Sequence, residues 1–108
     1  MTNATDEAIR TVFETFVDKN DEIIIPCPTF AMFKLNAELM DANIIEVMYN
    51  EDLSFPTKQI LEKMNKNTKM VILVNPNNPT ATSITDGDII KILDKAIKFN
   101  SIVFIDEA

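Results

Sequence analysis

Residues 70–79 read MVILVNPNNP, and this stretch decides the fold class of the 108-residue chain. Its first half, Met70–Val74, is an uninterrupted apolar run, which is typical of a strand buried on both faces of a parallel sheet. Its second half contains Pro76 and Pro79, which fix the backbone and block a helix, so a loop must follow the strand. The stretch therefore predicts a buried strand that ends in a rigid loop.

The rest of the chain repeats this pattern, with short apolar strands separated by amphipathic helices. Three further strands are predicted at residues 23–25, 44–49 and 102–105, and Pro26 is expected to end the first of them. Four helices are predicted. The first follows an N-cap at Thr5, with Asp6 and Glu7 in its first turn, and the second runs from about Phe30 to residues 41–43. The third is opened by Ser54-Phe55-Pro56, and the fourth is capped by Thr85 and has as its inner face Ile89, Ile90, Leu93, Ala96 and Ile97. The alternation indicates βαβ units, and so a single α/β domain with three α/β/α layers and a mainly parallel sheet.

Composition and charge argue against several kinds of binding partner and site. The net charge of −7 argues against nucleic acid, because neutralising phosphates requires clustered Lys and Arg. No apolar stretch approaches the ~20 residues that a membrane helix needs, and residues 1–7 do not resemble a secretory signal. A single cysteine, Cys27, and the absence of histidine argue against a disulfide or a transition-metal site and favour the cytoplasm. Gly87 is the only glycine, where average usage would give about seven or eight.

Three polar features are expected beyond the carboxyl ends of strands, where open parallel sheets bind ligands. Asn78, between two prolines, could present its amide at a fixed angle, although a simple proline-rich turn explains it as well. Asp106 directly follows the last strand and could pair with a protonated ring nitrogen, or be merely solvated. Residues 3–7 open the first helix, whose free N–H groups and dipole can cradle a phosphate, as can those of any helix.

In their order along the chain, these features resemble the motif series of the fold-type I aminotransferases (class I and II), which depend on pyridoxal 5′-phosphate (PLP). The histidinol-phosphate aminotransferase branch is the most similar. The matching segments are Asn3–Glu7, Pro28–Phe33, Asn75–Thr80 and Asp106–Ala108, of which Asn75–Thr80 is the most specific. The resemblance covers essentially the whole chain. It implies that the parent enzyme transfers an amino group between an amino acid and a 2-oxo acid, in histidine biosynthesis, as a homo-oligomer.

The resemblance also assigns six residues to the cofactor. Ala4, Thr5 and Asp6 would lie at the phosphate, Phe30 would stack on the pyridine ring, Asn78 would hydrogen-bond the phenolic oxygen, and Asp106 would pair with the ring nitrogen. Phe30 could equally anchor its helix in the core, and the two roles are compatible.

Some of the family's features have no match in the chain. Ala4 and Ala81 stand where the family usually has glycine, and a Cβ at either place could obstruct the cofactor. The Schiff-base lysine, the substrate-binding arginine, the N-terminal arm and the small domain are also without a match. Residues 1–108 are therefore expected to form part of the PLP-binding large domain, with no catalytic residue of their own. We expect no transaminase activity and at most weak, non-covalent binding of PLP or phosphate.

Two interpretations of different class stay open. In the first, the chain is a piece of an aminotransferase and is inactive by itself. In the second, it is a non-catalytic α/β module, such as a gene remnant or a proteolytic core, with weak or no PLP binding. The amino donor is also open, because aromatic-amino-acid aminotransferases and PLP decarboxylases have related motifs. An unrelated flavodoxin-like module would explain neither Asn75–Thr80 nor Asp106–Ala108.

The resemblance finally implies an order for the strands. The expected spatial order is residues 70–74, 102–105, 23–25 and then 44–49. In that order the strand at residues 70–74 has one open side. Because an open, apolar strand edge is a template for pairing with another chain, we expect self-association through this strand.

Overall fold

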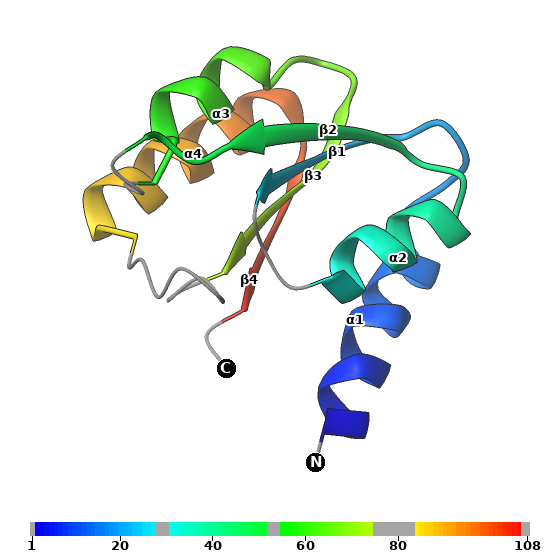
Figure 1. Cartoon of the computed structure of the whole chain (residues 1–108). Helices are drawn as coiled ribbons and strands as arrows, with labels where there is room; N and C mark the ends of the chain where they lie inside the picture. The colour runs from blue at the N-terminus through cyan, green and yellow to red at the C-terminus, as the bar shows by residue number, and fades with distance from the viewer. Residues whose placement is uncertain (1, 28–30, 52–54, 75–83, 107–108) are drawn as a thin grey trace.

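The structure is a computed structural model, and it describes residues 2–27, 31–51, 55–74 and 84–106. Four helices and four strands alternate along the chain (Figure 1). In chain order they are α1 (Thr2–Phe16), β1 (Glu22–Cys27), α2 (Ala31–Leu39), β2 (Asn43–Met48), α3 (Thr57–Lys63), β3 (Thr68–Val74), α4 (Asp86–Phe99) and β4 (Ile102–Asp106). The predicted alternation of strand and helix is confirmed.

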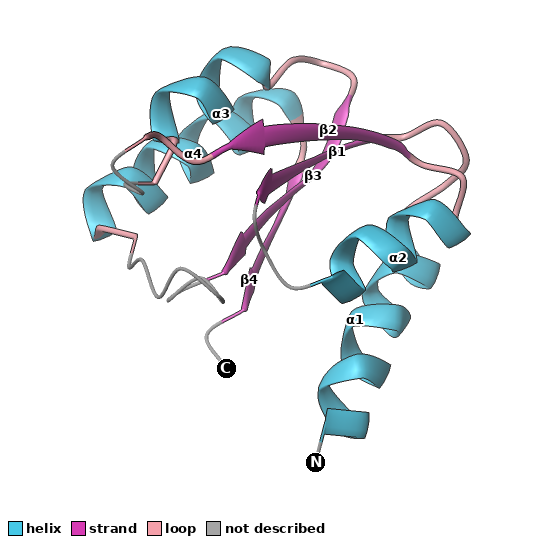
Figure 2. Cartoon of the chain, viewed as in Figure 1, coloured by secondary structure: helices cyan, strands magenta, loops and turns pink. Residues whose placement is uncertain are grey.

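The four strands form one parallel sheet with helices on both faces. The strand order is β2-β1-β3-β4. Helices α1 and α2 cover one face, and α3 and α4 cover the other (Figure 2). Side chains of β1 and β3 alternate between two buried cores: Ile23, Ile25, Met70 and Ile72 pack with α1 and α2, whereas Ile24, Val71 and Leu73 pack with α3 and α4. The predicted three-layer α/β/α architecture is confirmed.

The expected strand order, in contrast, is wrong. Strand β3 lies between β1 and β4, with Ile24 opposite Val71 on one side and Met70 opposite Ile102 on the other. Helix α3 carries the chain from β2 back across the sheet, so that β3 is added on the free side of β1. A strand with an apolar run such as residues 70–74 is most stable at such a central position, where both edges and both faces are covered. Within the described residues, the open edges belong to β2 and β4.

Pro26 does not end its strand as expected. Strand β1 continues to Cys27, and Pro26 pairs with Val47 of β2. The Cys27 carbonyl accepts a hydrogen bond from the Tyr49 N–H at 2.9 Å, so the main-chain groups of Cys27 face β2. The main-chain groups of Pro26, one residue earlier, therefore face β3. The pairing of β1 with β3 extends no further than Ile24. The N–H that proline lacks is not needed there.

Two helices differ in detail from the expectation. Helix α1 begins at Thr2, three residues before the predicted N-cap, and its first turn contains no acidic residue. Thr85 caps α4 as predicted, and its side chain accepts a hydrogen bond from the Asp88 N–H at 3.2 Å. The inner face of α4 is, however, rotated from the predicted one. Its buried residues are Ile92 and Ala96 with Ile89 partly buried, whereas Ile90, Leu93 and Ile97 are exposed.

Candidate functional site

The carboxyl edge of the sheet is the candidate site, because the chain reverses direction across the sheet there. From β1 the sheet grows first to β2, and then on the other side of β1 to β3 and β4. The reversal falls between β1 and β3, and open α/β sheets bind ligands beyond the carboxyl ends of the strands at such a point. The neighbouring strands β1, β3 and β4 end at Cys27, Val74 and Asp106.

The ends of β3 and β4 lie side by side at this edge. Asp106 is paired with Val74 in the strand register. Val74 is also the residue that directly precedes Asn75–Thr80, the most specific of the recognised segments. The structure thus brings the main chain of Asp106 next to the start of the segment that contains Asn78. Asn78 itself, and also Phe30 and Ala81, lie outside the described residues.

The start of α1 lies on the same side of the molecule as the end of β4, as the two chain termini in Figure 1 show. This position follows from the topology, because α1 enters β1 at the amino edge and so runs antiparallel to it. With the helix beginning at Thr2, Ala4 and Thr5 lie in its first turn and Asp6 directly after it. Unpaired N–H groups occur only in the first turn of a helix, so Asp6 is less well placed for a phosphate than predicted.

A polar cluster that the sequence analysis did not identify lies beside the end of β1. Lys34 of α2 and Glu46 of β2 form an ion pair at 2.8 Å. Burial, and then the Glu46 carboxylate, raise the pKa of the Cys27 thiol, whose Sγ lies 3.6 Å from the Ile25 carbonyl oxygen. A thiol with a raised pKa stays protonated at neutral pH, so Cys27 is not an activated nucleophile. The three residues come from three elements, and no local sequence pattern connects them.

Lys34 is unsuited to carry a cofactor covalently. Its hydrogen bond to Glu46 raises the pKa of its amine, whereas a nucleophilic lysine needs a lowered pKa. The same hydrogen bond lowers the pKa of Glu46. The segments that follow the carboxyl ends of the strands, residues 28–30, 49–56, 75–85 and 107–108, contain no lysine.

Tyr49 is the second group at this edge that the sequence analysis missed. It directly follows β2, is 91% buried, and packs edge-on against Phe55 with ring centroids 5.7 Å apart. Its hydroxyl is buried and has no hydrogen-bond partner among the described residues. Burial raises the pKa of Tyr49 to about 12. The phenol is therefore neutral at physiological pH.

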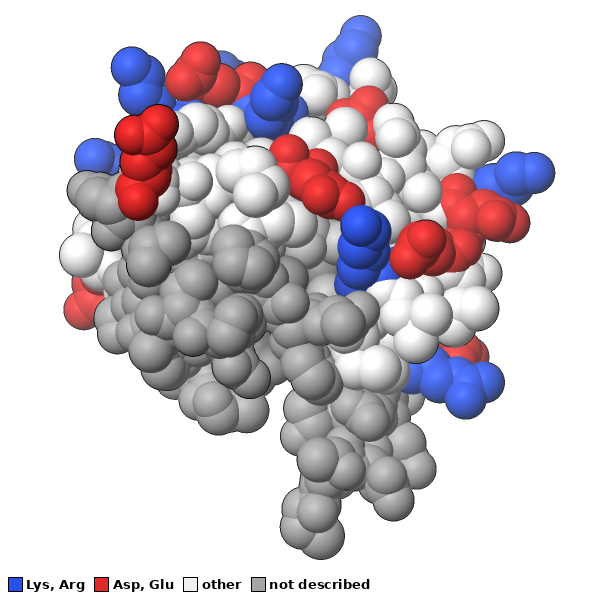
Figure 3. Space-filling view, in the orientation of Figure 1, with Lys and Arg blue, Asp and Glu red and all other residues white. Residues whose placement is uncertain are grey.

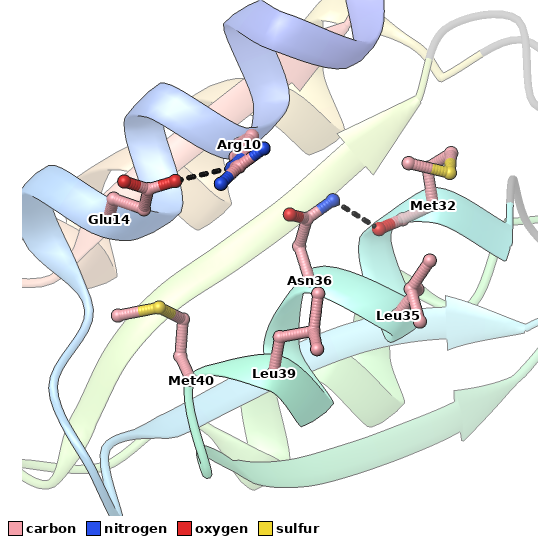
Figure 4. A pocket seen from close by; sticks show the side chains of 7 residues that line it. All are labelled: Arg10, Glu14, Met32, Leu35, Asn36, Leu39 and Met40. Atoms are coloured by element: carbon pink, nitrogen blue, oxygen red, sulfur yellow. Dashed lines mark hydrogen bonds and ion pairs between the residues drawn. The ribbon is translucent and has the colours of Figure 1, made fainter.

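A groove lies between α1 and α2 (Figure 4). Its polar contacts stay within single helices: Arg10 donates to Glu14 at 2.6 Å, and the Asn36 amide donates to the Met32 carbonyl at 2.8 Å. Its lining residues are Arg10, Glu14, Met32, Leu35, Asn36, Leu39 and Met40.

On the face in Figure 3, Lys and Arg are interspersed with Asp and Glu instead of forming a basic patch. No helix in the described part of the chain is long and apolar enough to cross a membrane. Within residues 2–27, 31–51, 55–74 and 84–106, no group of three or more Cys, Asp or Glu residues is arranged to hold a metal ion.

Comparison with known proteins gives a consistent answer. The family model for aminotransferase class I and II matches residues 1–108. The histidinol-phosphate aminotransferase of Caldanaerobacter subterraneus subsp. tengcongensis is 40% identical over 107 residues, and that of Methanocaldococcus jannaschii is 34% identical over 108. Each alignment covers 98% of this chain, but only 30% and 28% of the respective relative. The chain thus spans about 30% of the length of the curated relatives it matches.

Solved structures agree with the sequence relatives. An alanine aminotransferase from Pyrococcus furiosus superimposes with a TM-score of 0.87 at 26% identity, over 95% of this chain and 27% of that one. A PLP-bound putative aminotransferase from Clostridium difficile 630 superimposes with a TM-score of 0.82 at 25% identity, over 94% and 27% of the two chains.

Proposed function

The chain belongs to the aminotransferase class I and II family, and on this premise we propose that its parent protein is a PLP-dependent transaminase of the histidinol-phosphate type. The observation that supports the proposal most is the pairing of Val74 with Asp106. This register aligns the strand that leads into Asn75–Thr80 with the strand that ends in the candidate ring-nitrogen partner. Both strands end beside the topological switch point, where the fold class binds ligands.

Each predicted residue has one task at this edge. When bound, PLP supplies the electron sink for amino-group transfer. The Asp106 carboxylate would accept a hydrogen bond from the ring N–H and so keep the ring nitrogen protonated. By resemblance, the Asn78 amide would donate to the phenolic oxygen, and Phe30 would cover one face of the ring. N–H groups of the first turn of α1, at Ala4 and Thr5, hold the phosphate.

The 108-residue chain itself holds and orients the cofactor without completing the reaction. It has no lysine after the carboxyl end of any strand, and Lys34 is committed to Glu46. The competing proposal is a non-catalytic α/β module without cofactor binding. The substrates of the parent protein would be an amino acid and a 2-oxo acid, as the names of the relatives suggest. We place it in the cytoplasm, in histidine biosynthesis, as a homo-oligomer.

Binding of two probes to one variant tests the proposal. Pyridoxamine 5′-phosphate has the ring nitrogen and the phosphate but cannot react with lysines, and inorganic phosphate has the phosphate alone. We expect Asp106→Asn to weaken pyridoxamine phosphate by about tenfold or more in calorimetric titration and to leave inorganic phosphate unchanged. Asp94→Asn, at an exposed carboxylate of α4, is the matched control. Equal weakening of both probes would mean that Asp106 has no ring contact.

The absence of covalent chemistry is tested separately. After incubation with PLP and borohydride reduction, mass spectrometry should find sparse labelling distributed over several lysines, and no turnover should accompany it. Stoichiometric labelling of one lysine together with transaminase activity would contradict this part of the proposal.

A further inference from the structure

The connection between β1 and α2 is anchored at both of its described ends. It consists of residues 28–30, and Phe30, the candidate for stacking on the cofactor ring, directly precedes the first residue of α2. On the strand side, the Cys27 carbonyl accepts a hydrogen bond from the main chain just after β2. On the helix side, Lys34 in the first turn of α2 forms the 2.8 Å ion pair with Glu46 of β2. Both anchors therefore hold the ends of this connection to the same neighbouring strand.

Glu46 lies on the face of the sheet that α2 covers. It is paired with Ile25 in the parallel register, and Ile25 is buried in the core beneath α1 and α2. Because alternate residues of a strand face the same side, Cys27 shares this face, and it packs against the same core. The Glu46 carboxylate is close enough to the Cys27 thiol to contribute, after burial, to the raised pKa of that thiol. One carboxylate thus interacts with a residue on each side of the β1–α2 connection.

The position of Lys34 is not explained by the stability of its helix. A positive charge in the first turn is opposed by the helix dipole. The side chains of Lys34 and Glu46 are 50% and 42% exposed, and ion pairs exposed to this degree contribute little to the stability of a fold. What the pair does is join α2 to β2 at the end of the helix that is nearest to Phe30.

The same helical turn is held from a second side. Phe33 is completely buried and packs edge-on against Phe104 of β4, with ring centroids 5.5 Å apart. Strands β2 and β4 are the two outer strands of the described sheet. A single contact would leave the turn free to rotate about it, whereas contacts toward both outer strands fix its orientation. The Lys34–Glu46 pair is therefore the part of this arrangement that sets the rotation of the turn about the Phe33 contact.

We propose that Lys34 and Glu46 are positioning residues for the cofactor ring, an inference that rests on the proposed function and extends it beyond the six predicted residues. The ion pair orients the start of α2, and so the residue directly before it, Phe30, relative to the ring. Neither member of the pair contacts the cofactor itself. Binding of the ring therefore depends on the pair, whereas binding of the phosphate does not.

Calorimetric titration of Glu46→Gln with pyridoxamine 5′-phosphate and with inorganic phosphate tests the proposal. The variant keeps the size of the side chain and removes one negative charge, which by itself favours both anionic probes. We expect the opposite for pyridoxamine phosphate, a loss of about threefold in affinity, while phosphate binds as before or slightly more tightly. Glu14→Gln is the matched control, because it breaks the exposed Arg10–Glu14 pair of α1 and should show only the effect of the removed charge.

Two further variants test whether the pair acts through Phe30. Phe30→Leu should itself weaken pyridoxamine phosphate, and adding Glu46→Gln to it should cause no further loss, because the ring contact that the pair orients is already gone. Reversing the pair, with Lys34→Glu and Glu46→Lys in one chain, should restore the natural affinity. Circular dichroism establishes that every variant is folded. A variant that is merely less stable would show neither the missing additivity nor the recovery.

The outcomes separate this inference from the proposed function. A natural chain that binds no pyridoxamine phosphate would contradict the proposed function, and the positioning role with it. A natural chain that binds the probe, is weakened by Phe30→Leu and is unaffected by Glu46→Gln would overturn the positioning role alone. Equal weakening of both probes by Glu46→Gln, or additive losses when it is combined with Phe30→Leu, would also overturn the positioning role.

Discussion

At the amino end of the sheet each helix returns to its strand through a short turn, whereas long segments leave β2 and β3 at the carboxyl end. The turns at the amino end span residues 17–21, 40–42, 64–67 and 100–101, compared with residues 49–56 and 75–85 at the other end. The short turns are tied together by hydrogen bonds; for example, the Asn20 N–H donates to the Asp41 carbonyl at 2.9 Å. We therefore expect the turns at the amino end to stabilise the fold, and the segments at the carboxyl end to bind the ligand.

The amino end also explains the scarcity of glycine. Asn20, Asp41 and Asn100 all have positive φ, at 71°, 56° and 59°. Each follows a helix and precedes a strand, at a position that commonly requires glycine. Asn and Asp are the other residues that tolerate the left-handed conformation. A chain with a single glycine therefore makes three of its turns with Asn and Asp.

The largest effect on stability is expected at Thr68, the first residue of β3, which closes the amino-end turn at residues 64–67. This residue is 97% buried; its hydroxyl accepts a hydrogen bond from the Asn65 N–H at 2.9 Å, and its carbonyl accepts one from Ser101 Oγ at 2.6 Å. Thr68→Val keeps the shape and removes the hydroxyl acceptor, which should lower the free energy of unfolding by about 2 kcal/mol in urea denaturation. Affinity for pyridoxamine phosphate should not change. A loss of affinity at a temperature where the variant is fully folded would contradict the division.

Asn100 should show a smaller effect of the same kind. Asn100→Ala replaces a residue that tolerates positive φ with one that does not, and should cost about 1 kcal/mol, measured by thermal or urea unfolding. Asn100→Gly is the control, and it should be within about 0.5 kcal/mol of the natural chain. If both variants lost the same stability, the side chain of Asn100 and not its backbone conformation would be responsible.

At the carboxyl end, Tyr49 should make the free energy of unfolding depend on pH. Because its pKa is raised to about 12, the unfolded chain loses the phenol proton from about pH 10 while the folded chain keeps it. The unfolded state then binds fewer protons, so the free energy of unfolding should fall as the pH rises from 10 to 12. In Tyr49→Phe this component should disappear, and at pH 7 the variant should be equal to the natural chain or up to about 1 kcal/mol more stable. A clear loss of stability at pH 7 would show that the hydroxyl has a partner.

The sequence predicted the kinds of element correctly because each has a local signal. Apolar runs marked the four strands, and Thr85 marked the start of α4. The strand order has no such signal, since it depends on the side of β1 to which α3 returns the chain. The apolar positions of α4 also extend over more of its circumference than the core covers, so periodicity could not distinguish Ile92 from Ile90.

For the candidate site, the sequence identified candidate cofactor residues, and the structure showed which main-chain and side-chain groups lie next to each other. Asp106 was assigned by resemblance, and the structure adds that its main chain is paired with Val74. Asn78 and Phe30 stay predictions, because they lie outside the described residues. Lys34 and Glu46 lie on consecutive elements and meet because α2 packs beside β2, so no local motif connects them.

Amide chemical shifts of the isotope-labelled chain, titrated with pyridoxamine 5′-phosphate, test the central claim most directly. The account predicts that shift changes concentrate at the carboxyl edge, at Cys27, Val74 and Asp106, and in the first turn of α1. The amides of Asn20, Asn67 and Asn100 at the amino edge should stay unchanged and serve as an internal control. Changes confined to the amino edge, or none at a saturating concentration of the probe, would contradict the assignment of the carboxyl edge as the cofactor site.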